Sequence, residues 1–395
     1  MTARESYSSL SLHRRCPQAW HYQTVRQLVR DDPTDVKAEL EFGNWWHALR
    51  AGDSIDRGRR IGSLQWTPRL LSTVDDWPKV PTEESEVALR VLDSALEWWE
   101  QLPAEYQQTW VDRMGEPVVP RLQHVDARWR ARWKHDLLNE EPLAVEFFWK
   151  RVLPPDPDGD DPDTLLVGFV DEIYFDQRRN MIVMRDHKSH RQLAQQTTAD
   201  DLMDSQLQVY AWGAYEDVVS WGRGSPRAVA YDRVRMVAPK SPEVTLSGTL
   251  SKSVTDYDLA TYLEWAKGPD GQGVPYPGRK KDGSGAGVYT AEQNVIDRLS
   301  QPAASSAWFQ RTLTPLNTNI VRSHLLAAVD TSLDMISTRR RIEATGEAGR
   351  NLHKTCKWCD YVKICRAELV GGMDGEYVLS DYGLKPKPKK NRGEG

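Results

Sequence analysis

Two acids and a lysine lie near the ends of two adjacent apolar segments. Asp171 belongs to TLLVGFVDEIYFD, and Asp186 and Lys188 belong to NMIVMRDHKS, which follows the short link QRRN. The two-residue period of a strand places Asp186 and Lys188 on one face, and a tight hairpin brings Asp171 beside Asp186. Two carboxylates at that distance repel each other unless a cation lies between them, and their oxygens suit magnesium or manganese. The neighbouring lysine can orient a water molecule and offset the charge of a phosphate.

A simpler interpretation is an exposed hairpin with solvated charges, because Asp-x-Lys tripeptides are common. Two other features favour a site. His47 follows Gly43 by four residues in GNWWHAL, on a predicted helix. Gln206 and Tyr210 are also four residues apart, so they share one face of a second predicted helix. Taken singly, His47 is more often a core or surface histidine, and Gln206 and Tyr210 are more often packing residues, so the weight rests on their combination.

The apolar patterns predict the elements that position these residues. Strands are expected at 143–153, 164–176, 180–189 and 228–238, and helices at 35–51, 82–102 (capped by Thr82), 199–221 and 317–345. Three strands, a helix and a further strand indicate an α/β fold with a mixed central sheet flanked by helices. The Gly-rich stretch 266–290 is expected to form a loop, and the basic tail is expected to lack structure.

The four cysteines are unevenly spaced. Cys16 stands alone near the start, whereas Cys356, Cys359 and Cys365 fall within ten residues of one another. Thiolates in such a set suit tetrahedral zinc or an iron–sulfur cluster, although zinc sites more often show two CxxC-like pairs. Free thiols are the third possibility. Ligands at these positions would close nearly the whole chain into a loop and pin its ends against the core.

Charge and composition restrict the class of protein. The formal net charge of −5 excludes a uniformly basic surface but allows a local basic cleft. Candidate basic segments are RWRARWK (128–134), GRKK (278–281) and STRRR (337–341). RWRARWK alternates arginine with tryptophan, which suits phosphate contacts and base stacking, or equally an amphipathic helix whose tryptophans pack inward.

Targeting and motor signals are missing from the sequence. It has no run of 18 apolar residues and no apolar signal-peptide core, so we expect a cytoplasmic protein without membrane contact. It also lacks the GxxxxGK[ST] motif of P-loop ATPases.

The ordered motifs GxxxH (43–47), GFVD (168–171), DHK (186–188) and QxxxY (206–210) resemble the PD-(D/E)xK nuclease superfamily. The resemblance is closer to RecB/AddB-type exonucleases and their CRISPR-associated and phage-encoded relatives. It implies a restriction-endonuclease-like core, a mixed sheet flanked by helices, with helical insertions.

The resemblance also implies roles for individual residues. A divalent metal, Mg²⁺ or Mn²⁺, would be bound by His47, Asp171, Asp186 and the main-chain carbonyl of His187. Lys188 would be the catalytic lysine, and Gln206 and Tyr210 would complete the site on the substrate side. Many relatives carry Glu at the position of Asp186, and Glu146 stands where relatives often have an acid.

The segments around the cysteines, RRCPQAWHY and CKWCDYVKIC, resemble the iron–sulfur staple of AddB-type and CRISPR-associated nucleases. That resemblance implies a structural [4Fe–4S] cluster bound by Cys16, Cys356, Cys359 and Cys365.

These observations lead us to expect a metal-dependent DNA exonuclease acting on linear or single-stranded DNA in recombination, repair or end processing. Expected partners, besides DNA, are a helicase, a recombinase or a single-strand-binding protein. The alternatives are a non-catalytic iron–sulfur DNA-binding or scaffold protein of the same fold, and a nuclease that trims DNA for CRISPR adaptation. The expected organisation is an N-terminal helical segment (1–51), a helical insertion (52–140), the nuclease core (141–240), a helical and loop segment (241–350), the cysteine segment (351–370) and the basic tail (371–395).

Overall fold

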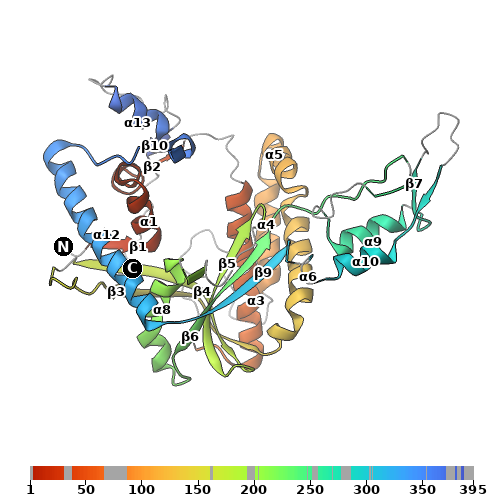
Figure 1. Cartoon of the computed structure of the whole chain (residues 1–395), viewed down its shortest axis with the longest axis horizontal. Helices are drawn as coiled ribbons and strands as arrows, with labels where there is room; N and C mark the ends of the chain where they lie inside the picture. Colours follow the sequence, from red (N-terminus) through yellow and green to blue (C-terminus); the bar gives the residue numbers. More distant parts are fainter. Residues whose placement is uncertain are drawn as a thin grey trace.

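The computed structural model of this chain is built around one mixed β-sheet (Figure 1). The residues it describes are 3–30, 38–65, 87–160, 163–193, 201–202, 204–246, 248–250, 257–268, 270–276, 286–301, 304, 306–352, 354–370, 379 and 384–386. In this part of the chain the sheet has six strands: β1 (Ala3–Ser6), β3 (Glu140–Val152), β4 (Thr164–Asp176), β5 (Met181–His190), β6 (Pro226–Arg235) and β9 (Phe309–Pro315).

Strand β4 is the centre of this sheet. It pairs antiparallel with β3 along most of its length. On its other side it pairs with two different strands, since residues 164–167 run parallel to β1 and residues 172–176 run antiparallel to β5. Residues 168–171 between these two ladders belong to neither. Beyond β5 the sheet continues through β6, parallel to β5, and ends at the antiparallel β9.

Helices cover both faces of the sheet (Figure 1). One face carries α3 (Ala38–Ile61), α4 (Val87–Glu100), α5 (Ala104–Met114) and α6 (Val118–Leu137), whose apolar residues form one core with Phe42, Trp46, Trp110 and Trp129 fully buried. The other face carries α1 (Tyr7–Arg15), α8 (Ser205–Ser220) and α12 (Thr318–Thr345), packed over a second core.

Smaller elements lie around this centre. Helix α1 is followed by α2 (Pro17–Trp20), η1 (His21–Val25) and β2 (Leu28–Arg30). The C-terminal part of the chain adds η3 (Lys354–Trp358), α13 (Val362–Leu369) and β10 (Leu384–Pro386), which pairs antiparallel with β2. A projecting arm contains α9 (Leu259–Lys267), α10 (Gln293–Leu299) and the hairpin β7 (Val274–Tyr276) and β8 (Gly287–Tyr289), which share a small aromatic core (Figure 1).

The predicted α/β architecture is confirmed, including the hairpin between the second and third predicted strands and the helix that follows them. The long C-terminal helix also begins where expected: Asn317 caps α12 by accepting hydrogen bonds from the main-chain N–H groups of Asn319 and Ile320. The predicted helix 82–102 is α4, and its expected cap Thr82 lies outside the described residues.

Other details differ from the expectation. The core is not confined to 141–240, since β1 and β9 come from outside this range and join the same sheet. Helix α3 continues past the expected boundary at residue 51 to Ile61. The stretch 266–290 contains a hairpin, and Leu384–Pro386 in the tail pairs with β2, because backbone pairing at a sheet edge needs few apolar side chains. None of the helices among the described residues is long and apolar enough to span a membrane.

Candidate active site

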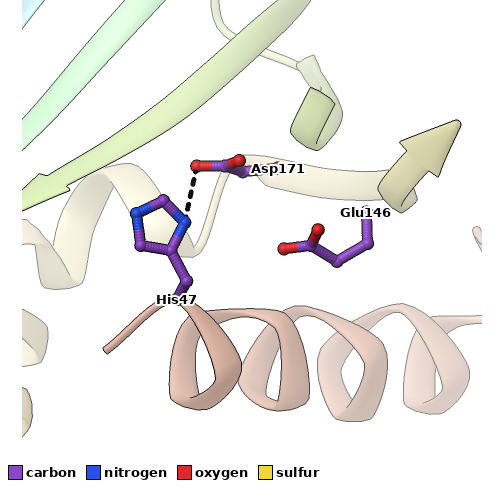
Figure 2. A group of neighbouring side chains, drawn as sticks. All are labelled: His47, Glu146 and Asp171. Carbon is purple, nitrogen blue, oxygen red and sulfur yellow. Dashed lines mark ion pairs between the residues drawn. The ribbon is translucent and has the colours of Figure 1, made fainter. Parts of the chain in front are cut away.

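Three ionisable side chains converge where β4 passes from one ladder to the other. They are His47 on α3, Glu146 on β3 and Asp171 on β4, and Figure 2 shows them pointing toward a common centre. Nδ1 of His47 lies 3.1 Å from Oδ2 of Asp171. One ligand atom from each of the three residues lies within 4.8 Å of the others. An imidazole nitrogen with two carboxylate oxygens is a donor set that suits a divalent cation.

Glu146 reaches this group through an unusual backbone conformation. Its φ is 48°, in the left-handed region, which costs a non-glycine residue about 1–3 kcal/mol. The neighbouring ladder pairs are Val145↔Glu172 and Phe147↔Val170, so Glu146 lies opposite Asp171 without forming a pair with it. Backbone strain of this kind is concentrated at functional sites, where the surrounding structure holds it in place.

Asp171 is held by the end of the next strand. Its Oδ2 accepts a hydrogen bond of 2.7 Å from the main-chain N–H of His187. The regular ladder between β4 and β5 ends at Glu172↔Arg185, so Asp171 lies just outside it. Beyond the ladder, this side-chain hydrogen bond connects the two strands, and it fixes the position of the Asp171 carboxylate.

A second group lies beside the first. Nζ of Lys188 is 2.8 Å from Oδ2 of Asp186 and donates to Oε1 of Gln206 at 3.1 Å. The Gln206 amide donates to Oδ1 of Asp186 at 3.4 Å and to the Tyr210 hydroxyl at 3.3 Å. Helix α8 presents Gln206 because Asp204 caps its first turn. The structure thus brings Asp186, Lys188, Gln206 and Tyr210 into one hydrogen-bonded group.

The acids of the site are crowded and buried, and their pKa values show the effect. Burial and the charge of Asp171 raise the pKa of Glu146 to about 8. The same two causes raise the pKa of Asp186 to about 6. Burial alone would lower the pKa of His47, but Asp171 raises it to about 9. Negative charge is in excess here, and a bound cation would relieve it.

His187 lies on the other side of β5 from its neighbours Asp186 and Lys188. Its ring packs 6.3 Å from that of Trp129 and 6.4 Å from that of His47. Burial lowers the pKa of His187 well below its usual value, so the ring is neutral. The proposed metal contact of this residue is through its carbonyl, and it stays a prediction.

Trp149 on β3 fixes the distance between the sheet and α8. A Cβ atom at Gly213 of α8 would lie 2.2 Å from the Trp149 ring, and one at Gly168 of β4 would lie 2.8 Å from it. Both positions therefore need glycine. The ring of Trp149 also packs edge-on against that of Tyr210, 5.4 Å away. Gly168, the glycine of GFVD, thus has a packing role. It leaves room for the Trp149 ring, which packs against Tyr210.

The site opens into a cleft of about 1220 Å³ between α3 and α4. His47, Glu146 and Lys188 lie along it. A ligand larger than a single small molecule fits in this volume, because pockets for drug-sized ligands measure about 300–1,000 Å³. The cleft therefore gives a large ligand access to Glu146 and Lys188.

Comparison with protein families gives a match to the PD-(D/E)XK nuclease superfamily over residues 4–366. The chain belongs to this superfamily. A comparison with curated proteins found none that matches it. The match supports a nuclease that uses a divalent metal and acts on DNA, and the four motifs that carried the resemblance are the segments that build this site.

The arrangement within this nuclease differs from the expected ligand set in one respect. Glu146, rather than Asp186, completes the compact group with His47 and Asp171, while Asp186 is turned toward Lys188. From the sequence alone, Glu146 is only a second-tier candidate, since an acid at this position can also be structural. Its signal is an acid in the middle of the apolar segment LAVEFFW, where a strand would otherwise bury an apolar side chain.

The four cysteines of the nuclease line a single cavity of about 520 Å³, although Cys16 is remote from the others in sequence. All four are partly buried and none forms a disulfide. Burial raises the pKa of the Cys359 and Cys365 thiols. Unlike the His47 group, no three of these sulfurs lie within 4.8 Å of one another, so they do not form a compact metal site as they stand.

The segment RWRARWK is not the stacking surface that it resembled. Trp129 is fully buried and donates its indole N–H to Asp232. Arg128 pairs with Asp258, and Arg130 pairs with Asp53. The inward-packing alternative is therefore correct, because α6 needs these aromatic rings for its core. GRKK (278–281) lies outside the described residues.

Proposed function

We propose that this protein is a divalent-metal-dependent deoxyribonuclease that degrades linear or single-stranded DNA as an exonuclease. The observation that carries the proposal is the group formed by His47, Glu146 and Asp171 beside Lys188 in an open cleft. Buried acids that face one another with raised pKa values are typical of functional sites.

The proposed metal ligands are His47, Glu146 and Asp171, with Asp186 and the main-chain carbonyl of His187 as further ligands. Their donor set fits Mg²⁺ or Mn²⁺, since the oxygen ligands are hard and the excess negative charge calls for a cation. When bound, such an ion acts as a Lewis acid on the scissile phosphate.

The proposed role of Lys188 is to orient the attacking water and to offset charge on the phosphate. Burial would lower the pKa of Lys188, but Asp186 raises it, so the ammonium group stays charged at neutral pH. Asp186 and Gln206 use two of its N–H groups. A third N–H is left to donate to water or to a phosphate oxygen. Tyr210 holds Gln206 in place on the substrate side.

The test is degradation of end-labelled linear single-stranded and double-stranded DNA and of closed circular DNA with Mg²⁺ or Mn²⁺. Wild-type protein is compared with Lys188→Ala and with the control Lys150→Ala, which removes an exposed lysine from β3 of the same sheet. We expect wild type and Lys150→Ala to degrade linear DNA and spare circles, and Lys188→Ala to be inactive.

Cleavage of closed circular DNA would show that the activity is that of an endonuclease and not of an exonuclease. Absence of cleavage by folded wild-type protein that still binds DNA would favour a non-catalytic DNA-binding or scaffold protein. A stable complex with an integrase, with trimming of its DNA, would favour the CRISPR-adaptation role.

The proposal includes a structural [4Fe–4S] cluster held by Cys16, Cys356, Cys359 and Cys365. Support comes from the four free thiols around one cavity and from the flanking sequences. A cluster held there would tie the segment 356–365 to α1 and α2.

Metal analysis tests this part. Protein purified anaerobically is expected to be brown, with about four irons and four sulfides per chain, and Cys359→Ser is expected to lose both the colour and stability. One zinc per colourless chain would establish a zinc site instead. The proposed setting is recombination, repair or end processing, with a helicase, recombinase or single-strand-binding protein as partner.

A further inference from the structure

The cleft extends beyond the acids along the walls formed by α3 and α4, and two tryptophans line this extension. Trp45 belongs to α3 and Trp98 to α4. Their ring centroids are 5.8 Å apart and the rings are tilted by 54°. Each side chain is only partly buried, so each keeps some surface open to the cleft. Trp45, Trp98 and the proposed metal ligands His47 and Glu146 all line the same cleft.

Neighbouring tryptophans of the same helices differ from Trp45 and Trp98 in their access to the cleft. Trp46 follows Trp45 in sequence and is fully buried. On α4, Trp99 packs against Trp110 at 6.0 Å, as Trp98 does at 5.8 Å, yet Trp99 does not line the cleft. Trp45, Trp98 and Trp99 all pack against this core, but only Trp45 and Trp98 of the three also line the cleft.

The charges along the cleft are unequally distributed. Glu41 and Glu97 lie on the same walls as the two tryptophans, whereas Lys188 lies at the end occupied by the proposed metal ligands. Phosphates of a DNA strand are repelled by the acidic walls and attracted to the lysine. The uncharged bases have no such penalty beside the tryptophans, and every base has a face that can stack on an aromatic ring.

We infer that Trp45 and Trp98 form a stacking pocket for unpaired bases of the strand whose phosphate lies at Lys188. This inference rests on the proposed nuclease function and specifies its substrate as a single strand or a frayed duplex end. A paired base cannot enter, because both of its faces are covered by its neighbours in the duplex. The two tryptophans thus determine specificity and take no part in the chemical step.

The test is a double-mutant cycle between Trp98 and the bases of the strand. Affinities of wild type, Trp98→Leu and Trp98→Phe are measured for a fluorescent single-stranded oligonucleotide in EDTA, where no cleavage occurs. The measurement is repeated with one abasic site moved along the strand. Trp99→Leu is the matched control, since it removes a tryptophan that contacts Trp110 outside the cleft.

We expect Trp98→Leu to weaken binding about 5- to 150-fold, as loss of one stacked base predicts, and Trp98→Phe to retain most of the affinity. An abasic site at the stacked position should weaken wild type and leave Trp98→Leu unchanged. Equal losses in Trp98→Leu and Trp99→Leu, or additive effects at every position, would overturn the pocket. Thermal unfolding of each variant separates binding losses from misfolding.

Failure of the stacking pocket can be distinguished from failure of the proposed nuclease function. Cleavage in Mg²⁺ without coupling between Trp98 and any base would reject the pocket and keep the nuclease. Coupling in a protein that cleaves no DNA with Mg²⁺ or Mn²⁺ would keep the pocket and reject the nuclease.

Discussion

Two buried groups of charges lie on opposite sides of strand β5, and they are built in opposite ways. Arg185 and Asp186 are adjacent in sequence, so their side chains point to opposite faces. On the Arg185 side, Glu140 and Glu172 each lie 2.7 Å from the guanidinium. On the Asp186 side, carboxylates of different strands face one another around His47.

The pKa values of two glutamates on β3 express this difference. Burial would raise the pKa of Glu140, but Arg185 and Arg311 lower it to about 2. For Glu146, burial and Asp171 act in the same direction and raise the pKa to about 8. The same residue type on the same strand thus titrates far apart, because one has cations as partners and the other has anions.

The comparison separates a group of paired buried charges from the proposed metal site. In the Arg185 network each acid has a guanidinium partner, so the network holds β3, β4, β5, β6 and β9 together without a ligand. In the His47 group His47 and Lys188 compensate Asp171 and Asp186 only in part, and Glu146 has no cationic pair within it, which leaves the protein to gain stability when a cation binds. Mutations at equivalent positions should therefore have opposite effects on stability and activity.

The largest expected effect is on stability and comes from Glu140→Gln. It removes the buried acid that Arg185 and Arg311 share and leaves them with Glu172 and Asp232, and breaking such buried pairs costs about 3–5 kcal/mol. Chemical denaturation should show this loss of unfolding free energy. Glu141→Gln is the control, since its less buried pair with Arg223 is worth at most about 1 kcal/mol. Equal effects of the two variants would contradict the structural role of the network.

The next effect is on activity and comes from Asp171→Asn. This change keeps the size of the side chain and its acceptor for the His187 N–H but removes the charge. We expect DNA cleavage to fall by at least about 10²-fold, while the protein stays folded. Steady-state cleavage and circular dichroism measure the two properties. Activity within a few-fold of wild type would remove Asp171 from the site.

Metal binding should stabilise the protein only through the His47 group. At a hundredfold excess over the dissociation constant, Mg²⁺ or Mn²⁺ should add about 2.7 kcal/mol to the unfolding free energy of wild type. The gain should shrink in Glu146→Gln and persist in Glu141→Gln. Thermal unfolding with and without the ion measures it, and an equal gain in both variants would exclude Glu146 as a ligand.

The smallest expected effect concerns pH in the absence of metal. Because the folded pKa of Glu146 is raised from 4.5 to about 8, its contribution is present below pH ~4.5 and is lost as pH rises toward 8. Glu146→Gln should therefore be more stable than wild type at pH 8–9, by about 1–3 kcal/mol after allowance for partial exposure. Denaturation at several pH values measures the difference. Parallel curves of unfolding free energy against pH for the two proteins would show that the pKa of Glu146 is not raised by folding.

Glu140 should show the opposite dependence of stability on pH in the same experiment. Its pKa is lowered from 4.5 to about 2, so its contribution is present above pH ~4.5 and is lost as pH falls toward 2. Below pH 4.5 wild type and Glu140→Gln should converge in stability. Convergence above neutral pH instead would contradict the assignment of the two groups.

Local sequence patterns predicted much of the fold. The apolar segments and the short link QRRN predicted the hairpin of β4 and β5, because alternation and turn residues are local properties. The spacing of Asp186 and Lys188 likewise predicted their shared face, and their 2.8 Å contact agrees with it. The order of the motifs indicated the superfamily, which the match over residues 4–366 shows.

The sequence by itself determined which chemical groups the chain carries and how they are spaced along each strand and helix. Only the tertiary structure decided that Glu146 faces Asp171 across a ladder, that the RWRARWK tryptophans pack inward, and that Cys16 joins the other three cysteines around one cavity. The physical reason is that these arrangements depend on contacts between segments remote in sequence. Helical and strand periods fix which residues share a face, but not which segment that face will meet.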